Sequence, residues 1–249
     1  MLSIVIPTLN EAAALERLLP HLAHTCPEAE AIVVDGGSTD GTPERVRRCP
    51  GVRVIEASRG RARQMNAGAG AGGGSTILFL HADTVLPPDA PQAIEDALRD
   101  PGVVGGRFDV RFDNPRAVFT LIATMMNIRS RLTHICTGDQ AIVVRRQIFG
   151  ELGGYPDIPL MEDIELSRRL KRRGRIACLR QRVTTSARKW EGEGALRTIT
   201  LMWALRLLYW AGVEPARLHR WYYGGRTDGH PHIRGSAGAG GSRGTTEPR

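Results

Sequence analysis

A histidine and an aspartate end one apolar run of the chain. Residues 75–83 read STILFLHAD, so the run delivers His81 and Asp83 to its carboxyl end. An acid at such a strand end can hold a divalent cation against a diphosphate, because Mg²⁺ often takes one or two protein carboxylates and completes its shell with phosphate oxygens. The same aspartate also suits a turn or helix cap ahead of Pro87 and Pro88.

A second aspartate ends another apolar run. Asp35 follows IVV and precedes GGSTDGT, whose glycines let the backbone approach a ligand closely. Its carboxylate can accept hydrogen bonds from the N–H groups of a base or from ribose hydroxyls. A plain turn, in which Ser38 or Asp40 caps the next helix, explains the same residues.

Two adjacent acids, Glu162 and Asp163, stand before the segment IELSRRLKRRG. Acids in the first turn of a helix interact favourably with its dipole, so capping is one explanation. Beside an electropositive donor site, one of these acids could instead act as a general base.

Basic residues gather in two places. Arg59, Arg63 and Asn66 share one helical face by their spacing, where they can contact phosphates or form a solvated face. From Arg168 to Lys189 the chain carries ten Lys or Arg and no acid. That stretch suits either a solvated basic helix or a surface for anionic lipid or an anionic acceptor.

An alternation of short strands and helices would position these residues. Strands are predicted at 2–8, 31–35, 52–57, 75–83 and 103–112, with helices at 10–24, 42–48, 61–70 and 91–99 and Asn10 as the first cap. This order predicts an α/β fold with a doubly wound, mainly parallel sheet and helices on both faces. Ligands bind at the carboxyl ends of such strands, so Asp35 and Asp83 should meet at one crevice. The GAGAGG run at 68–73 follows a helix and precedes a strand, the wrong order for a dinucleotide-binding dehydrogenase.

The second half is predicted to hold a helix at 117–128, a strand at 139–146 and a helix at 163–173. The segment 201–213, LMWALRLLYWAGV, is shorter than the ~20 residues that span a bilayer. Its three aromatics and the preceding basic stretch favour an interfacial helix on an anionic membrane surface, whereas burial of an apolar helix on the domain explains them equally. The Gly- and Ser-rich tail at 226–249 is predicted to be disordered.

Composition limits the class of protein. The 249 residues carry a net charge of +8, which favours polyanionic partners without identifying them. The four scattered cysteines and the absence of a signal-like start favour a reduced, cytoplasmic location, with a peripheral position on the inner face of the cell membrane as its extension. The basic stretch lacks interleaved aromatics, so no nucleic-acid partner is expected.

Seven segments together resemble family 2 glycosyltransferases, and they occur in the family's order over residues 2–195. They are SIVIPTLNE (3–11), VVDGGSTDGT (33–42), GRARQMNAGA (60–69), FLHADT (79–84), TGDQAIVVRR (137–146), GGYPDIPLMEDIELSRRLKRRG (153–174) and TSARKWEGEG (185–194). The resemblance is to a small bacterial subgroup with an HAD variant of the DxD motif. It implies a single GT-A domain over 1–225, with a nucleotide-sugar-binding half (1–112), an acceptor and catalytic half (113–194) and an apolar helical region (195–225).

The resemblance also implies roles for individual residues. Asp163, with Glu162 as the alternative, would be the base, and Asp83 would bind a divalent cation, Mg²⁺ or Mn²⁺. The expected donor-binding set is Pro7, Thr8, Asn10, Glu11, Asp35, Gly36, Arg63, Asn66, His81, Ala82 and Asp83. The expected acceptor-side set is Gly138, Asp139, Arg188 and Trp190. His81 stands where the family usually has the first Asp of DxD, so cation binding would depend on Asp83 and the diphosphate.

The function so implied is an inverting, metal-assisted transfer of one sugar from a nucleotide-sugar to a small-molecule or lipid-like acceptor. One alternative is a sugar-phosphate nucleotidyltransferase, although PTLNEAAA stands where that class has a Gly-rich basic loop. The other is a non-catalytic module that binds nucleotide or membrane, against which the joint presence of Asp83 and Asp163 argues.

Overall fold

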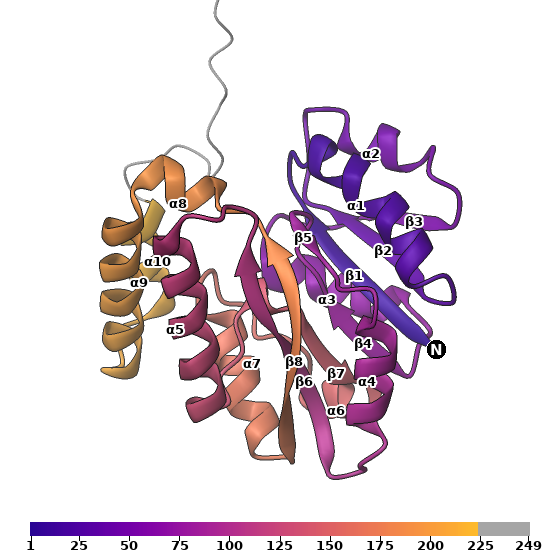
Figure 1. The fold of residues 1–249 in the computed structure, drawn as a ribbon. Helices are drawn as coiled ribbons and strands as arrows, with labels where there is room; N and C mark the ends of the chain where they lie inside the picture. Colours follow the sequence, from indigo (N-terminus) through magenta and orange to yellow (C-terminus); the bar gives the residue numbers. More distant parts are fainter. Residues whose placement is uncertain (224–249) are drawn as a thin grey trace, which may run out of the picture.

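The structure is a computed structural model that describes residues 1–223, the side chains of residues 189, 193 and 196 excepted. The predicted disordered tail at 226–249 lies outside the described residues. The elements are β1 (Leu2–Thr8), α1 (Ala12–Thr25), β2 (Glu30–Asp35), α2 (Thr42–Val46), β3 (Val52–Glu56), α3 (Arg61–Ala71), β4 (Thr76–Phe79), β5 (Thr84–Val85), α4 (Ala90–Leu98), β6 (Val103–Phe112), α5 (Ala117–Thr133), the 3₁₀ turn η1 (Gly138–Gln140), β7 (Ile142–Arg145), α6 (Arg146–Glu151), α7 (Glu162–Lys171), β8 (Arg175–Thr185), α8 (Arg188–Glu193), α9 (Ala195–Trp210) and α10 (Pro215–Tyr223) (Figure 1).

The strands form one sheet in the order β3-β2-β1-β4-β7-β6-β8-β5. The pairs β1–β2, β1–β4, β2–β3 and β6–β8 are parallel, whereas β7 runs antiparallel to both of its neighbours and β5 runs antiparallel to β8. The predicted mainly parallel α/β sheet is therefore confirmed. The strands of the second half are inserted among those of the first, β7 between β4 and β6 and β8 between β6 and β5, so both halves build one sheet.

Helices cover both faces of the sheet, as predicted. Along β1, Ile4 joins one buried cluster with Leu15 of α1, while the next residue, Val5, joins a second cluster with Met65 of α3 and Leu166 of α7. This alternation follows from the two-residue period of a strand, which sends successive side chains to opposite faces. The apolar runs at 2–8 and 31–35 are buried because both faces are covered.

Several predicted boundaries were wrong. The strand predicted at 75–83 ends at Phe79, which pairs with Ile142, the first residue of β7. Beyond Phe79 the chain no longer pairs with β7. A turn follows, in which the Thr84 N–H donates to the His81 carbonyl (3.1 Å). α5 continues to Thr133 instead of ending at residue 128, and β7 is shorter than the predicted strand at 139–146.

The interpretation of the basic stretch as one solvated helix was also wrong. Its middle forms strand β8, which lies parallel to β6. Ile176 and Val183 of this strand are buried, while the intervening Arg180 and Arg182 are exposed. Pairing with β6 satisfies the backbone of this segment, and long-range pairing of this kind overrides what a local charge pattern suggests.

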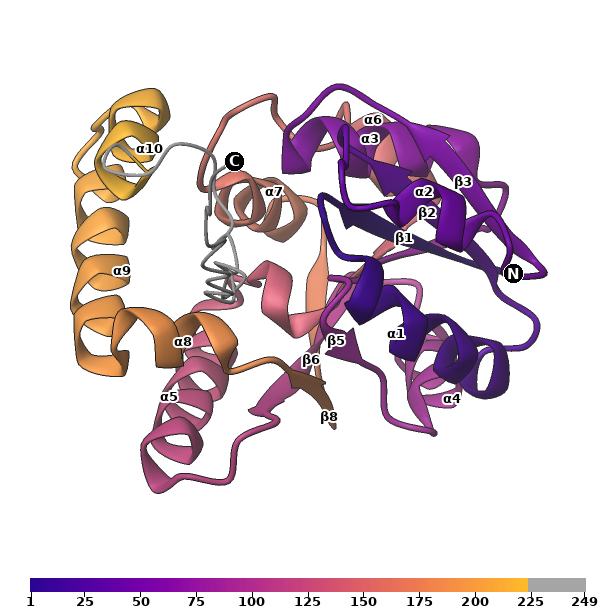
Figure 2. The ribbon, with the colours of Figure 1, turned by 90° about the horizontal axis from the view of Figure 1, so that it is seen from above.

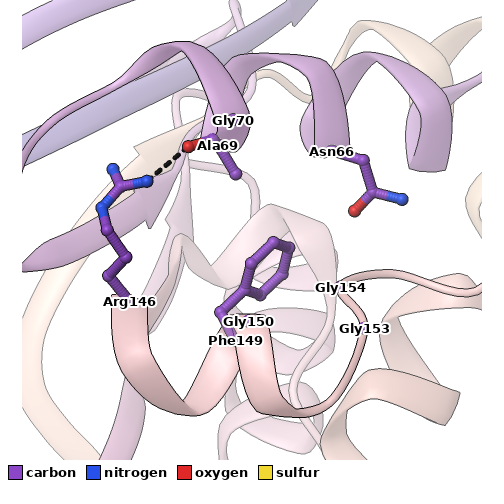
Figure 3. Close-up of a pocket in the computed structure, with 8 residues that line it drawn as sticks. All are labelled: Asn66, Ala69, Gly70, Arg146, Phe149, Gly150, Gly153 and Gly154. Atoms are coloured by element: carbon purple, nitrogen blue, oxygen red, sulfur yellow. Dashed lines mark hydrogen bonds between the residues drawn. The ribbon is translucent and has the colours of Figure 1, made fainter.

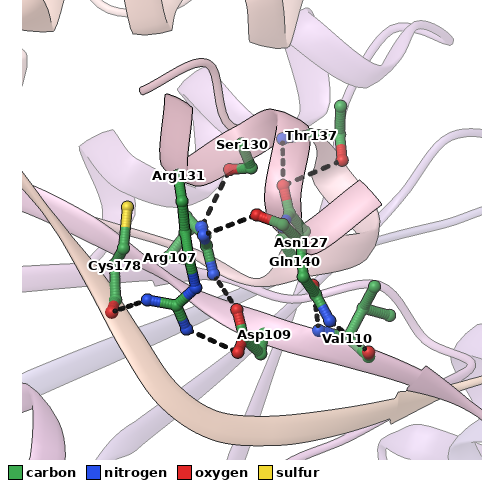
Figure 4. Close-up of polar contacts among 9 residues, drawn as sticks. All are labelled: Arg107, Asp109, Val110, Asn127, Ser130, Arg131, Thr137, Gln140 and Cys178. Atoms are coloured by element: carbon green, nitrogen blue, oxygen red, sulfur yellow. Dashed lines mark hydrogen bonds and ion pairs between the residues drawn. The ribbon is translucent and has the colours of Figure 1, made fainter. Parts of the chain in front are cut away.

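A buried charge network attaches α5 to the sheet (Figure 4). Arg107 of β6 is fully buried, pairs with Asp109 and donates from Nε to the Ser130 hydroxyl (2.8 Å). Arg131 contacts the other oxygen of Asp109 (2.5 Å) and donates to the Cys178 carbonyl of β8 (3.2 Å). The Asp109 carboxylate thus pairs with two guanidinium groups. Together with the bond from Arg131 to Cys178, these pairs fix the position of α5 relative to β6 and β8.

Trp221 of α10 is exposed, and helices α5 and α9 each expose several large apolar side chains. On α5 they recur at helical spacing, at Val118, Leu121, Met125, Ile128 and Leu132. On α9, Leu205 is buried in a small cluster with Ile164 of α7, but Trp203, Leu207 and Trp210 are exposed. The view from above shows α9 at the rim of the molecule, and α8 connects it to β8 (Figure 2). Of the two interpretations of the apolar segment, burial of its aromatics is wrong for Trp203 and Trp210. None of the described helices is long and apolar enough to cross a membrane.

Candidate active site

The first part of the crevice is the loop that follows β2. Asp35 ends that strand and is buried, and its Oδ2 accepts the N–H groups of Gly37 (2.8 Å) and Ser38 (2.9 Å). Gly37 has φ +93°, a conformation that favours glycine. Asp35 therefore makes a turn, as the plainer alternative held, and lies at the carboxyl ends of β1 and β2, but the expected cap by Ser38 or Asp40 is wrong, since the N-cap of α2 is Gly41, which has no capping side chain.

This loop is attached to the segment after β1. The N–H of Asn10 donates to the Ser38 hydroxyl, and the Asn10 Oδ1 accepts the N–H of Thr39, both at 2.8 Å. Asp40 Oδ2 accepts the N–H of Ala12 (3.1 Å). The prediction that Asn10 caps the first helix was wrong: its φ is +57°, and its side chain holds the neighbouring loop instead.

Gln64 is a structural residue of this site that the predicted set omits. It is buried on α3, and its Nε2 donates to the carbonyls of Thr8 (2.8 Å) and Val34 (2.9 Å). A Cβ at Gly36 would lie 2.9 Å from that nitrogen, so a larger residue there displaces the amide. Its place within GRARQMNAGA, one of the segments that resemble the family, was the only sign in the sequence that Gln64 belongs to the site. Pro7 and Thr8 complete the end of β1, and the Thr8 hydroxyl donates to Val34 O (3.2 Å).

Three charged side chains meet beside this loop. The Arg188 guanidinium lies 3.5 Å from Glu11 and 3.9 Å from Asp83. Burial and then the charge of Asp83 raise the pKa of Glu11, while Arg188 and His81 act in the opposite direction. Arg188 thus lies with the predicted donor residues, although it was predicted for the acceptor side. Trp190 packs its ring against Phe112, with the ring centroids 5.7 Å apart.

The turn after β4 connects Asp83 to the candidate base. His81 Nδ1 lies 3.4 Å from Asp139 Oδ1. The next contact runs from the Gly138 N–H to Asp163 Oδ2 (3.1 Å). A Cβ at Gly138 would lie 2.4 Å from the His81 imidazole, so this close approach requires glycine. Ala82 is buried between His81 and Asp83. The contacts therefore bring the segment that carries Asp83 close to Asp163, although the two acids are 80 residues apart in sequence.

Glu162 and Asp163 differ in their surroundings. Glu162 is 5% exposed, and burial followed by the charge of Asp163 raises its pKa. Arg61 lies 3.9 Å away and opposes this increase. Asp163 is partly exposed and accepts the Ile164 N–H (2.7 Å) as well as that of Gly138. Of the two acids, Asp163 is therefore the more accessible.

Arg63 and Asn66 have structural partners away from these acids. Arg63 Nε donates to Asp157 (2.9 Å), and the Asn66 amide exchanges two hydrogen bonds of 2.8 Å with the backbone of Tyr155. They hold the segment that precedes α7. An open hollow of about 350 Å³ lies beside them, lined by Asn66, Ala69, Gly70, Arg146, Phe149, Gly150, Gly153 and Gly154 (Figure 3). No acid lines this hollow, and the Arg146 guanidinium already donates hydrogen bonds to the carbonyls of Ala69 and Gly74. The hollow therefore does not suit the predicted cation binding or general-base catalysis.

A cation would find few protein ligands in the crevice. Within residues 1–223, no group of three or more His, Cys, Asp or Glu side chains is arranged to hold a metal ion. Asp83 offers one partly exposed carboxylate, with Glu11 sharing the same arginine. This set suits Mg²⁺ or Mn²⁺ only where an incoming ligand, such as a diphosphate, supplies most of the oxygens.

Comparison with known proteins identifies relatives of this arrangement. Residues 3–154 match the sequence profile described as Glycosyl transferase family 2. A PGL/p-HBAD biosynthesis glycosyltransferase of Mycobacterium bovis is 34% identical over 166 residues, which cover 62% of this chain and 63% of that protein. An undecaprenyl-phosphate 4-deoxy-4-formamido-L-arabinose transferase of Aeromonas hydrophila is 31% identical over 117 residues, 42% of this chain and 36% of that protein. The match thus spans less than two thirds of each relative's length.

Solved structures share the fold. A mannosyltransferase of Pyrobaculum calidifontis, in complex with GDP-Man and Mn²⁺, superposes with a TM-score of 0.65 at 22% identity, covering 89% of this chain and 69% of that one. S. aureus TarS 1-349 gives a TM-score of 0.58 at 19% identity, covering 75% of this chain and 60% of that one. These similarities confirm the predicted GT-A fold.

Proposed function

Because the chain belongs to glycosyl transferase family 2, we propose that it transfers one sugar from a nucleotide-sugar donor to a small-molecule or lipid-like acceptor, with inversion at the anomeric carbon. The observation that carries this proposal is a pair of contacts between distant segments, His81 with Asp139 and Gly138 with Asp163, of which His81 stands two residues before Asp83. These contacts bring the segment of an acid suited to the donor diphosphate close to an acid suited to the acceptor.

The donor would lie over the carboxyl ends of β1 and β2. The loop after Asp35 and the segment after Thr8 are attached to each other by hydrogen bonds, so their backbone is held in place before a ligand arrives. Asp35 would accept from the base or ribose. Arg188 would contact the diphosphate, since a guanidinium presents two parallel donors to phosphate oxygens.

A divalent cation would be held by Asp83 together with the donor diphosphate. Its contribution when bound would be to offset the negative charge that develops on the leaving diphosphate. The mannosyltransferase with which this chain shares its fold is described with GDP-Man and Mn²⁺. His81, in the place of a carboxylate, would contribute no negative charge toward the cation.

Asp163 would act on the acceptor. The acceptor oxygen attacks the anomeric carbon from the face opposite the leaving group, and its proton passes to the Asp163 carboxylate. The bond from the anomeric carbon to the diphosphate breaks, and the nucleoside diphosphate leaves with the electron pair. The backbone N–H groups of Gly138 and Ile164 orient this carboxylate, which is a requirement for a general base.

A lipid-like acceptor fits the exposed apolar side chains of α5 and α9. Trp203 and Trp210 suit the headgroup level of a bilayer, and the net charge of +8 favours an anionic surface. The Aeromonas relative is named for an undecaprenyl-phosphate substrate. A peripheral position on the inner face of the cell membrane would bring such an acceptor to the crevice.

A donor screen tests the proposal. UDP-, GDP- and dTDP-sugars are added with and without Mn²⁺, and Tm is measured, because a ligand at about 100 times its Kd stabilises the fold by about 2.7 kcal/mol. One donor is expected to raise Tm, and more strongly with Mn²⁺. Absence of any shift at millimolar donor would contradict the proposed donor site. Pyrophosphate release from a nucleoside triphosphate and a sugar phosphate would instead indicate a nucleotidyltransferase.

A further inference from the structure

Two arginines near the crevice have no role in the proposed reaction. Arg129 lies on α5 and Arg206 on α9. Nε and Nη2 of Arg129 and Nε of Arg206 are buried, and they have no hydrogen-bond partner among residues 1–223. The contrast with the same helix is sharp, because Arg131, two positions further along α5, contacts Asp109.

Unpaired guanidinium donors in the interior are unfavourable. Burial removes their hydration, and only an opposite charge or hydrogen bonds restore it. Burial and then the charge of Arg206 lower the pKa of Arg129, and burial likewise lowers the pKa of Arg206. Binding of an anion between α5 and α9 would therefore stabilise the charged form of both guanidinium groups.

The position of the two arginines indicates which substrate they face. Asp163 is the first acid whose charge opposes the decrease in the pKa of each arginine, and Asp139 follows for Arg206. Both helices belong to the second half of the chain, whereas Glu11 and Asp83 border the donor side. Packing agrees, because Leu205, next to Arg206, belongs to one buried cluster with Ile164, next to Asp163, so α9 lies against the helix that carries the proposed base.

We propose that Arg129 and Arg206 bind an oxyanion, a phosphate or carboxylate, that the acceptor carries. This inference rests on the proposed function, since it assigns a substrate class to the acceptor side of that site. Two guanidinium groups supply forked N–H donors that match the geometry of phosphate and carboxylate oxygens. The oxyanion would anchor the acceptor and present its nucleophilic oxygen to Asp163.

The test compares probes that separate the sources of the oxyanion. Binding of n-decyl phosphate below its micellar concentration, of inorganic phosphate and of the neutral n-decyl glucoside is measured by tryptophan fluorescence. Wild-type protein is expected to bind decyl phosphate more tightly than decyl glucoside. Inorganic phosphate that binds as tightly as decyl phosphate would indicate a free anionic acceptor, and a preference for decyl phosphate a lipid headgroup. Either result supports the proposal, whereas equal affinity for decyl phosphate and decyl glucoside overturns it.

Variants assign the binding to the pair. Arg129→Gln and Arg206→Gln are each expected to weaken decyl phosphate binding about tenfold or more, since a hydrogen bond to a charged group contributes about 1.5–3 kcal/mol. Arg206→Met, which keeps much of the volume, should do the same with Tm unchanged or raised. The exposed Arg197 of α9 provides the control, and Arg197→Gln should alter neither quantity.

Separate outcomes distinguish this inference from the proposed function. Unchanged decyl phosphate affinity in all three variants overturns the inference. That outcome says nothing against the proposed function if the protein still binds a nucleotide-sugar. Loss of nucleotide-sugar affinity in the arginine variants would assign the pair to the donor diphosphate and also overturn it. If wild-type protein binds decyl phosphate but no nucleotide-sugar, the proposed function fails instead. Asp228→Asn and Glu247→Gln remove the two acids beyond residue 223, and tighter phosphate binding in either variant would identify that acid as the counter-ion and overturn the inference.

Discussion

Arg188 lies near two carboxylates, Glu11 and Asp83, so the proposed donor side contains a charge cluster whose balance changes with protonation and with any bound cation. The proposed acceptor side is arranged differently, because Asp163 is held by backbone N–H groups and its neighbour Glu162 is buried. Single substitutions should therefore separate donor binding from turnover.

Asp83→Ala is expected to abolish cation-dependent donor binding and to leave the fold intact. Asp83 is partly exposed, and substitutions at such sites usually change stability by no more than about 0.5 kcal/mol. Donor affinity is measured with and without Mn²⁺, with Asp89→Ala at a nearby exposed acid as the control. Unchanged Mn²⁺-dependent affinity in the Asp83 variant would rule out its role.

Asp163→Asn should lower kcat by about 100-fold or more while sparing donor affinity, because general-base catalysis contributes about 10²–10⁴-fold. Steady-state kinetics and donor titration are compared in the same preparation. Glu162→Gln is the matched variant. Near-normal kcat in Asp163→Asn combined with loss in Glu162→Gln would assign the base to Glu162.

Glu11 gives a prediction of pH dependence. Its folded pKa is raised above 4.5, so the fold binds its proton more tightly than the unfolded chain does. The stabilisation from the neutral form is complete below the unfolded pKa and is lost as pH rises through the folded pKa. Glu11→Gln should therefore raise Tm relative to wild type at pH 7.5 but not at pH 4. A larger gain at pH 4 than at pH 7.5 would show that the direction is wrong.

Among the elements, α5 has the most demanding position. Its Arg131 contacts Asp109 of β6 and the Cys178 carbonyl of β8, it carries Arg129, and it presents an apolar row to solvent. The attachment of α5 to the sheet therefore depends on Asp109, which can be tested directly.

Asp109→Asn should destabilise the fold by about 3–5 kcal/mol, because removing one member of a buried ion pair leaves an uncompensated charge, here that of Arg107. Urea unfolding measures the free energy of unfolding. The exposed Arg111→Ala on the same strand is the control and should stay within about 0.5 kcal/mol of wild type. A loss below about 1 kcal/mol in Asp109→Asn would mean that the network is not a structural requirement.

The whole molecule combines a basic charge with exposed apolar helices on one side of the sheet, α5 and α9 (Figures 1 and 2). Apolar side chains supplemented by basic charge bind the interface of an anionic bilayer. A protein so equipped could hold its crevice at a lipid surface without any spanning helix.

Co-sedimentation with vesicles tests this surface. Wild-type protein is expected to bind vesicles rich in phosphatidylglycerol at low salt and to dissociate as salt rises, since the Debye length falls from about 30 Å at 0.01 M to about 8 Å at 0.15 M. Replacing Trp203 and Trp210 by Ser should abolish vesicle binding without lowering Tm. Val85 is an exposed apolar residue of β5, and the control variant Val85→Ser should bind the vesicles as wild type does. No sedimentation of wild type at low salt would favour a small polar acceptor.

The sequence by itself determined the α/β class, the strands β1 to β3 and the placement of Asp35 and Asp83 after strands, because buried apolar runs ended by glycines and acids have few other structures open to them. The ordered motifs also predicted the family. Only the tertiary structure decided that Arg188 reaches Glu11, that His81 joins Asp139 across 58 residues, and that the basic stretch contains β8. These contacts join segments far apart in the chain, and a local pattern carries no information about which distant partner satisfies a strand edge or a charge. The same reason hid the buried nitrogens of Arg129 and Arg206 that have no hydrogen-bond partner among residues 1–223, since such a lack becomes visible only once the surrounding elements are placed.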